Sequence, residues 1–261
     1  MQPLGRAATD AFRQVRFVLT DMDETLTFNG RLGAATYDAL ERLQRAGVTV
    51  IPVTAAPAGW CDQMARMWPV DGVIGENGGF HFRREREGHG LVRDFWHEEA
   101  TRPAVTAELA RIADTVQAAL PFARFAEDQP FRLTSLAFAQ PGGEADRTAL
   151  LAALHAAGAA TTVNNLWVLG WIGAYDKLAM ARRVLGSTYG LDIDADREAV
   201  LYVGDSTNDA PMFGFFRHSV GVSTVTRYLD QIPTPPAWIT QGPGGSGFVE
   251  AAEAVIRARD S

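Results

Sequence analysis

Two short segments of the sequence concentrate side chains that could do chemistry. Residues 21–25 read DMDET, and residues 204–209 read GDSTND. Carboxylates that share a low-dielectric cleft repel one another and raise each other's pKa unless a cation offsets them. Carboxylate and carbonyl oxygens suit Mg²⁺, which usually shares its coordination shell with a substrate phosphate. If the two segments converge, they predict Mg²⁺-dependent phosphate chemistry at Asp21, Asp23, Asp205 and Asp209.

Two further residues complete a site for a phosphoryl group. Thr54 ends the apolar run 48–53, so its hydroxyl can reach the same rim, and Lys177 begins a helix from which an ammonium can neutralise phosphate charge. An aspartate can attack phosphorus and form an aspartyl-phosphate that water later hydrolyses. A second carboxylate two residues further on can protonate the leaving oxygen and then activate that water.

The apolar runs that precede these residues predict strands of one parallel sheet. The strand candidates lie at 15–20, 48–53, 72–75 and 199–204. Amphipathic segments at 33–46 and 57–68 separate the first three strands and have apolar residues at helical spacing. Single helices between strands imply βαβ units, and such sheets bind ligands beyond the carboxyl ends of their strands. The sequence therefore predicts an open α/β sheet with the site at that edge.

A different rhythm between the two acidic segments predicts an inserted domain. Its elements are a hairpin at 80–84 and 91–96, a helix at 103–120, a strand at 132–139, an Ala-rich helix ending at Gly158, and a strand at 161–169. Antiparallel elements in this position favour a second, small α/β unit. We therefore expect a core at 1–81 and 174–261 with an inserted α/β cap at 82–173.

The motif set resembles a known superfamily. Asp21-x-Asp23-x-Thr25, Thr54, Lys177 and the segment 204–209 resemble the four ordered motifs of the haloacid dehalogenase (HAD) superfamily. The insert, with GENGG at its entrance (75–79), resembles the Cof-type class IIB, which includes sucrose-phosphate and mannosyl-phosphoglycerate phosphatases. The resemblance implies a doubly wound, mainly parallel Rossmann-like core sheet and a phosphatase. Glu24 and Leu178 depart from it, because many members have Gly at both positions.

The resemblance also implies a role for each motif residue. Asp21 would be the nucleophile and a metal ligand, and Asp23 the general acid and base, with its backbone carbonyl on Mg²⁺. Thr54 and Lys177 would hold the phosphoryl oxygens. Asp205 would be a direct metal ligand. Asp209 would orient metal-bound water or Lys177, and Asn208 would contact the phosphate or its ligands.

Substrate discrimination must come from residues that reach the leaving group, which the cap would supply. Asn164 and Asn165 are adjacent amides in the expected strand 161–169, so strand alternation sends one of them toward the substrate. Arg132 could instead meet a second anionic group, such as a glycerate carboxylate. Asn77, at the entrance of the insert, is a fourth candidate. The expected substrate is a small phosphate ester, most plausibly a sugar phosphate.

Charge and composition narrow the partners. Lys and Arg number 24 against 31 Asp and Glu, giving a net charge of -7, whereas nucleic-acid binding normally leaves a basic stripe. A single cysteine excludes a disulfide framework, and no apolar run approaches the ~18 residues of a membrane span. We therefore expect a reduced cytoplasmic protein without nucleic-acid or membrane partners. The oligomeric state stays open.

Two rival functions remain. A phosphomutase would use the same nucleophile but return the phosphoryl group to a second hydroxyl, and residues 171–177 faintly resemble the mutase approach to the lysine. Against this, the segment 54–56 resembles a phosphatase second motif. A non-catalytic metabolite-binding module is the other rival. The intact set Asp21, Asp23, Lys177 and Asp205 argues against it.

Overall fold

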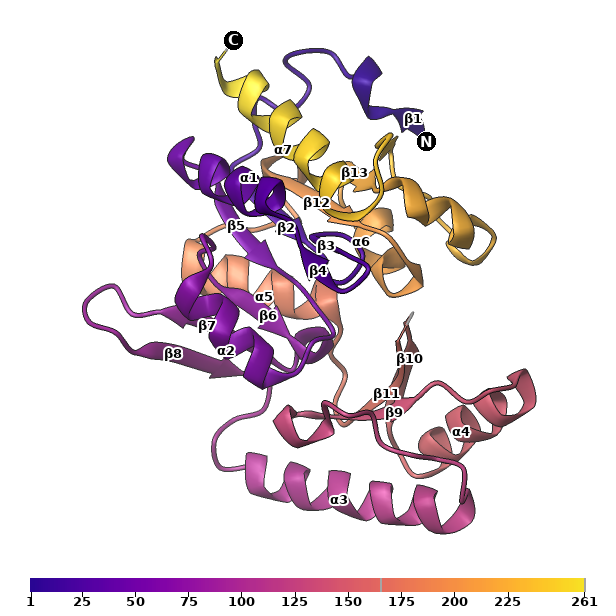
Figure 1. Ribbon diagram of the computed structural model, residues 1–261. Coiled ribbons are helices and arrows are strands. Elements are labelled where there is room, and N and C mark those ends of the chain that lie inside the picture. The colour runs from indigo at the N-terminus through magenta and orange to yellow at the C-terminus, as the bar shows by residue number, and fades with distance from the viewer. Residues whose placement is uncertain (165, 261) are drawn as a thin grey trace.

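A six-stranded parallel sheet forms the centre of the protein, whose computed structural model describes residues 1–164 and 166–260 (Figure 1). In spatial order its strands are β1 (Gln2–Pro3), β14 (Trp238–Ile239), β13 (His218–Gly221), β12 (Val200–Gly204), β2 (Phe17–Thr20) and β5 (Thr49–Pro52). All five neighbouring pairs are parallel. The expectation of a mainly parallel core sheet is therefore confirmed.

Helices cover both faces of this sheet. α1 (Ala34–Arg45), α2 (Ala58–Met67) and α7 (Gly244–Asp260) share one apolar cluster, and α5 (Lys177–Tyr189) and α6 (Ala210–Phe215) share another. Val18 belongs to the first cluster and Leu19 to the second, because successive residues of a strand point to opposite faces. This alternation makes the core doubly wound.

The outer edge of β5, which has no neighbouring strand in the six-stranded sheet, is covered by the loop that contains Asp71. Val50 donates its N–H to the Asp71 carboxylate (2.8 Å), and its carbonyl accepts the N–H of Asp71 (2.8 Å). Further along, Val53 forms a parallel bridge with Ile74 of β6 (Val73–Gly75). The chain from Asp71 to β6 thus closes this side of the sheet.

The hairpin that we expected at the start of the insert lies against the core instead. β7 (Phe80–Arg84) and β8 (Leu91–Phe95) form an antiparallel sheet with β6, and Phe80 and Phe82 belong to the apolar cluster of α1 and α2. The proposed boundary at residue 82 falls inside β7. β8 pairs with β7 and belongs to this small sheet and not to the β10-β11-β9 sheet.

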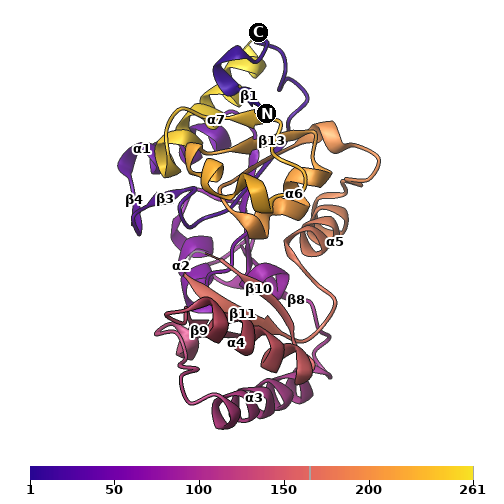
Figure 2. The same ribbon diagram turned by 90° about the vertical axis from the view of Figure 1, so that its right-hand side faces the viewer.

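The cap is a three-stranded antiparallel sheet with two helices on its outer face (Figure 2). Its elements are α3 (Arg102–Ala119), β9 (Ser135–Ala139), α4 (Glu144–Ala156), β10 (Ala160–Val163) and β11 (Trp167–Trp171), with sheet order β10-β11-β9. Phe138 and Val168 pack under the helices, whereas Ala137 and Leu169 face a smaller cluster that includes Ala55 of the core. One face of the cap sheet thus covers the core.

The prediction of a single strand at 161–169 is wrong, because β10 and β11 are two separate antiparallel strands. Thr162 pairs with Leu169 across the β10–β11 hairpin. Asn164 lies in the turn, where its Oδ1 accepts the N–H groups of Leu166 (2.9 Å) and Trp167 (2.8 Å). An asparagine side chain that binds backbone two and three residues on is a typical turn device. Asn164 follows the end of β10 at Val163, so strand alternation does not set the direction of its side chain. Asn165 lies outside the described residues.

Short elements complete the chain. They are β3 (Thr27–Phe28), β4 (Arg31–Leu32), and the 3₁₀ turns η1 (Leu4–Arg6), η2 (Glu76–Gly78), η3 (Gln129–Phe131), η4 (Arg197–Ala199), η5 (Thr207–Asp209) and η6 (Ser223–Gln231). Within the described residues, no helix has the length and apolar character needed to cross a membrane.

Candidate active site

The two acidic segments meet because β2 and β12 are neighbours. Val203 pairs with Thr20, so both strands end at the same edge, and the N–H of Asp21 donates to the Val203 carbonyl (2.8 Å). Carboxylate oxygens of Asp21, Asp205 and Asp209 lie within 4.8 Å of one another, and all three residues are buried. The structure therefore brings together segments that are about 180 residues apart.

Asp209 is held by donors on both of its oxygens. Its Oδ2 accepts the N–H groups of Asp205 (2.9 Å) and Ser206 (3.1 Å), while its Oδ1 accepts Lys177 Nζ (2.7 Å) and the Tyr202 hydroxyl. A carboxylate with every side occupied in this way positions its neighbours. Asp209 thus contacts both Lys177 and the backbone of the second acidic segment.

The motif loop also needs a glycine. A Cβ built on Gly204 would lie 2.5 Å from Asp209 Oδ2. Any larger residue at this position would push the carboxylate of Asp209 away from the donors that hold it.

Lys177 joins the two acidic segments at the start of α5. The N-cap residue Asp176 accepts the N–H of Ala179 (2.7 Å), which fixes the first turn of the helix. Lys177 Nζ donates to Asp21 Oδ1 (2.8 Å) as well as to Asp209. Burial alone would lower the pKa of Lys177, but the Asp209 and Asp21 carboxylates together raise it above its ordinary value. The ammonium therefore stays charged between the two carboxylates.

The carboxyls of the first motif titrate near neutrality. Burial raises the pKa of Asp21 to about 6, even though the Lys177 ammonium opposes the shift. Burial and the Asp21 charge raise the pKa of Asp23 to about 7. A carboxyl whose pKa lies near the working pH can both donate and accept a proton, which is what a general acid and base requires.

Thr54 is fully buried at the end of the β5 segment. Its Oγ1 accepts the N–H of Ala56 (3.0 Å), and its carbonyl accepts the N–H of Asn77 (3.0 Å). The hydroxyl can therefore still donate its own proton to a phosphoryl oxygen. Asn77 is itself buried, with φ +58°, and it contacts this loop rather than the hollow described next.

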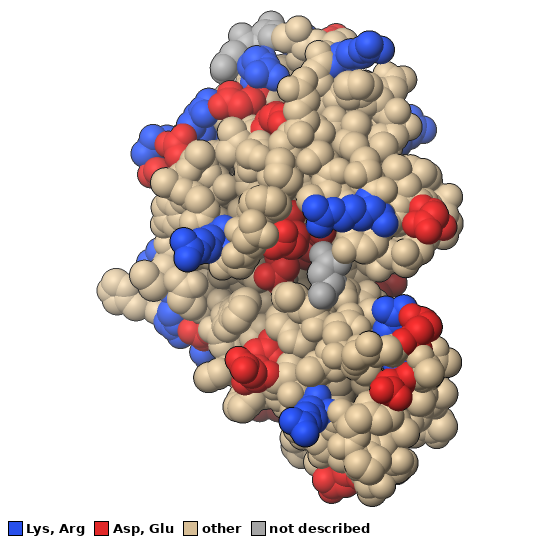
Figure 3. All heavy atoms as spheres, turned by 45° about the vertical axis from the view of Figure 1, so that its right-hand side comes forward, with Lys and Arg blue, Asp and Glu red and all other residues tan. Residues whose placement is uncertain are grey.

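A hollow between core and cap exposes the carboxylates. Figure 3 shows acidic side chains gathered at the bottom of this hollow, which opens to solvent. Its volume is about 60 Å³, and its lining residues are Asp21, Asp23, Glu24, Gly30, Ala55, Asn164, Leu166, Asp205, Ser206 and Asn208. Asn164 and Leu166 come from the cap hairpin, so the cap contributes directly to the site.

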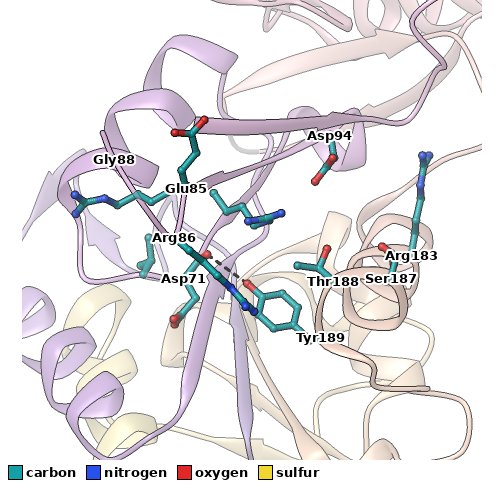
Figure 4. A pocket seen from close by; sticks show the side chains of 12 residues that line it. Asp71, Glu85, Arg86, Gly88, Asp94, Arg183, Ser187, Thr188 and Tyr189 are labelled. Atoms are coloured by element: carbon teal, nitrogen blue, oxygen red, sulfur yellow. Dashed lines mark hydrogen bonds between the residues drawn. The ribbon is translucent and has the colours of Figure 1, made fainter. Parts of the chain in front are cut away.

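A second, larger hollow on the protein is lined by none of the residues that line the hollow between core and cap. It has a volume of about 1000 Å³ and lies between the β7–β8 hairpin and the C-terminal half of α5 (Figure 4). Arg86, Arg183 and Tyr189 line it, and the Tyr189 hydroxyl donates to the Asp71 carbonyl (3.3 Å). Of these two hollows, only the smaller one is lined by motif residues, which include Asp21, Asp23 and Asp205.

Comparison with known proteins places the fold. No protein-family model and no curated protein matches the sequence. Among solved structures, a Thermoplasma acidophilum protein is similar at TM-score 0.71 and 18% identity, covering 93% of this chain and 99% of that chain. The sucrose-phosphatase of Synechocystis, solved with sucrose and phosphate, is similar at TM-score 0.64 and 14% identity. The similarity covers 93% of this chain and 98% of that chain. A HAD-superfamily phosphatase from Bacteroides thetaiotaomicron is similar at TM-score 0.63 and 18% identity. The similarity covers 94% of this chain and 96% of that chain.

The chain has the HAD fold. Both the parallel core and the inserted cap are covered by these similarities, because they extend over more than nine-tenths of each chain. The parallel core sheet and the inserted unit therefore agree with the fold that the sequence predicted.

One departure from the HAD motif has a visible conformational cost. Glu24 adopts φ +57°, in the left-handed region that a glycine reaches without strain. For a residue with a Cβ this conformation costs about 1–2 kcal/mol. Glu24 also adds negative charge beside Asp23.

Arg132 does not line the hollow. Its guanidinium donates to both oxygens of Asp128 (3.2 and 2.7 Å), to the Ala55 carbonyl (3.0 Å) and to Ser135 Oγ (3.3 Å). It also lies before β9 rather than at its start. The structure thus gives this cation partners within the protein in place of the expected second anion of a substrate.

One residue of the site was missed, and one residue of the first motif was given no role of its own. Tyr202 binds Asp209 from the middle of β12, where a single phenol in an apolar strand was the available signal. Thr25 Oγ1 lies 3.4 Å from Asp205 Oδ1, so the threonine of the first motif links the two acidic segments. Asn208, which was expected, lines the hollow, and its Oδ1 accepts the Ser206 hydroxyl (2.9 Å).

The raised pKa of Asp23 predicts an unusual pH dependence of stability. Its folded pKa of about 7 exceeds the ordinary value of 3.8, so the folded protein binds more protons than the unfolded chain between these values. Stability without metal therefore falls as pH rises through this window. We expect Asp23→Asn, measured in EDTA by thermal unfolding, to melt above wild type at about pH 8 and to lose this advantage toward about pH 4. A difference that stays constant with pH would contradict the assignment.

Proposed function

We propose that the protein is a Mg²⁺-dependent phosphomonoester hydrolase that acts on a small phosphorylated metabolite, most plausibly a sugar phosphate. The observation that carries the proposal is the buried Lys177 ammonium between Asp21 and Asp209, beside Asp205. A cation held among carboxylates at the edge of an α/β sheet is suited to an incoming phosphoryl group. The similarity to a sucrose-phosphatase solved with phosphate supports the same class of substrate.

The geometry supports a two-step reaction. The Asp21 carboxylate attacks phosphorus, and the Lys177 ammonium and Thr54 hydroxyl stabilise the charge on the phosphoryl oxygens. Asp23, protonated near neutral pH, gives its proton to the leaving oxygen. The resulting Asp23 carboxylate then takes a proton from the water that hydrolyses the aspartyl-phosphate. Each turnover thus returns both carboxyls to their starting states.

The donor set fits Mg²⁺. Hard oxygen ligands from Asp21 and Asp205 lie together at the cluster, whereas Asp209 uses its oxygens to hold neighbouring donors. We therefore assign the ion to Asp21 and Asp205, and the motif resemblance adds the backbone carbonyl of Asp23 as a third ligand. When bound, it offsets the repulsion between the carboxylates and neutralises phosphate charge.

The lining of the hollow favours an uncharged leaving group. Of the described residues that line it, none is Lys or Arg, while Asp23 and Glu24 are acidic. A second anion on the substrate would meet the acidic side chains of Asp23 and Glu24 there. Asn164 supplies an amide, which can recognise sugar hydroxyls, and Leu166 supplies an apolar surface. A phosphorylated polyol fits this lining better than a phosphoglycerate.

A phosphate-release screen with Mg²⁺ tests the function. We expect release from sugar monophosphates to be faster than from phosphoglycerates of similar size. Isomerisation without release would identify a phosphomutase, and binding without turnover would identify a metabolite-binding module. Either of these outcomes would contradict the hydrolase.

We also place the protein in the cytoplasm. The single cysteine, Cys61, is free and buried, which suits a compartment that keeps thiols reduced.

Metal binding should be measurable as stability. We expect wild type to melt several degrees higher in excess Mg²⁺ than in EDTA, because a ligand selective for the folded state adds about 2.7 kcal/mol at a concentration of 100 Kd. Asp205→Ala should narrow this gap, and Asp194→Asn, which removes a charge from an exposed ion pair, should leave it unchanged. Equal wild-type midpoints in the two conditions would count against a metal at the cluster.

A further inference from the structure

One face of the small β6–β7–β8 sheet forms a wall of the larger hollow. Side chains alternate along β7, so Phe82 packs in the apolar cluster of α1 and α2 while Arg83 lies on the opposite face. Asp94 shares the face of Arg83, because it pairs with His81 across the β7–β8 ladder. His81 is fully buried at the inner end of this face. The outer end, nearer the hairpin turn, lines the hollow, and α5 forms the other wall (Figure 4).

The lining of this hollow is rich in arginine. It includes four arginines, three from the hairpin and one from α5, although the chain as a whole has a net charge of -7. They are Arg83, Arg84, Arg86 and Arg183. Figure 4 shows Arg86 and Arg183 on opposite sides of Tyr189. An anion in the hollow would therefore meet guanidinium groups from both walls.

Arg83 is the arginine whose surroundings call for a ligand. It is half-buried, and its Nε is enclosed without a hydrogen-bond partner among the residues that the structure describes. Enclosed donors are nearly always paired in folded proteins, because leaving one unpaired costs free energy. The His81 ring and the charges of Arg83 and Arg183 hold the pKa of Asp94 below its ordinary value, so the two arginines lie close to the same point of the hollow. A bound anion would give both guanidinium groups a further acceptor.

Three acidic residues also line the hollow, and two of them face partners within the protein. The Asp71 carboxylate accepts the N–H of Val50 (2.8 Å). Asp94 Oδ2 lies 3.6 Å from His81 Nδ1. The third is Glu85, at the end of β7, and its charge would oppose an anion. Removing this charge should therefore strengthen the binding of an anion.

We propose that the larger hollow binds a small molecule that carries at least two phosphate groups. The planar guanidinium group donates two parallel hydrogen bonds to a phosphate, and a phosphate offers three acceptor oxygens where a carboxylate offers two. Arginines on two walls favour two phosphate groups over one, and a volume of about 1000 Å³ holds a molecule of this size. This binding site does not depend on the hydrolase function, because it shares no lining residue with the hollow over the carboxylates.

Isothermal titration calorimetry with sodium tripolyphosphate tests the site. The titration is done in EDTA, which keeps Mg²⁺ away from the carboxylate cluster. We expect one tripolyphosphate per chain, bound at least about tenfold more tightly than inorganic phosphate, which can reach only one wall. Arg83→Met and Arg183→Met should each weaken the binding about tenfold or more, since each removes charge-assisted hydrogen bonds. Glu85→Gln should strengthen it.

The hairpin supplies a matched control on its other face. Arg93 carries the same charge but binds Asp62 of α2 (2.7 Å) and does not line the hollow. Arg93→Met should therefore keep the wild-type affinity. Equal weakening by Arg93→Met and Arg83→Met would indicate general attraction between charges and would overturn the proposal. If Arg83→Met fails to fold, Arg86→Met, at an exposed position near the hairpin turn, is judged by the same criterion.

Backbone amide NMR spectra locate the bound probe. We expect tripolyphosphate to shift amide signals of residues 83–88 and 183–189 and to leave those of residues 21–25 unchanged. Shifts confined to residues 21–25 and 204–209 would place the probe at the carboxylate cluster and overturn the second site. So would a wild-type protein that binds no tripolyphosphate, or that binds phosphate equally well. If no ester releases phosphate while tripolyphosphate binds as described, the proposed function fails and the second site stands.

Discussion

Asp21→Asn should lose at least about 10⁴-fold in phosphate release while keeping the fold, because an amide cannot attack phosphorus. The asparagine oxygen can still accept a hydrogen bond from the Lys177 ammonium, which also keeps its hydrogen bond to Asp209. We would measure kcat with the best substrate in excess Mg²⁺ and compare circular dichroism spectra of variant and wild type.

A matched control removes a carboxylate of the same size elsewhere. Asp194→Asn breaks an exposed pair with Arg182 and should retain wild-type turnover. Turnover of Asp21→Asn close to the wild-type rate would remove Asp21 from the role of nucleophile, whatever the screen shows about the substrate.

Asp23→Asn should reduce turnover by about 10²–10⁴-fold, the usual contribution of a general acid or base. The size of this loss of turnover should depend on the leaving group, since p-nitrophenolate departs without a proton whereas a sugar alkoxide needs one. We therefore expect a larger loss of kcat/KM with the sugar phosphate than with p-nitrophenyl phosphate. An equal loss with both esters would indicate that Asp23 acts mainly by holding the structure or the metal ion.

The core of the site could be predicted because its residues follow strand ends. Asp21 and Asp205 come directly after apolar runs, and parallel strands present their carboxyl ends at one edge of the sheet. The sequence does not say locally that β12 lies next to β2, which sets the distance between these carboxylates. We could expect the two strands to be neighbours only because the order of the four motifs resembles that of the HAD superfamily.

The cap was less predictable because its charged and amide residues bind neighbours that local patterns do not reveal. Apolar residues on both sides of Asn164 suggested one strand, although an asparagine pair is also a turn signal. Arg132 looked available for substrate, yet Asp128 stands one helical turn before it and takes two of its hydrogen bonds. Glu76 carried no signal beyond its place in the GENGG segment, because its donors come from residues about sixty positions away.

The hairpin boundary illustrates the same limit. Alternation in residues 80–84 correctly predicts a strand with Phe80 and Phe82 on one face. It does not say which apolar surface that face covers. In the structure both rings pack in the apolar cluster of α1 and α2, which the alternation of residues 80–84 does not indicate.

The closed margin of the central sheet has a consequence for self-association. Exposed strand edges invite another chain to add a strand, which is a common route to aggregation. Here one margin is β1, only two residues long and ending in Pro3, which has no N–H to donate. At the other margin Asp71 occupies both backbone groups of Val50 with its own N–H and carboxylate. Neither side of the sheet therefore offers a long run of unpaired backbone groups as a template for a second copy.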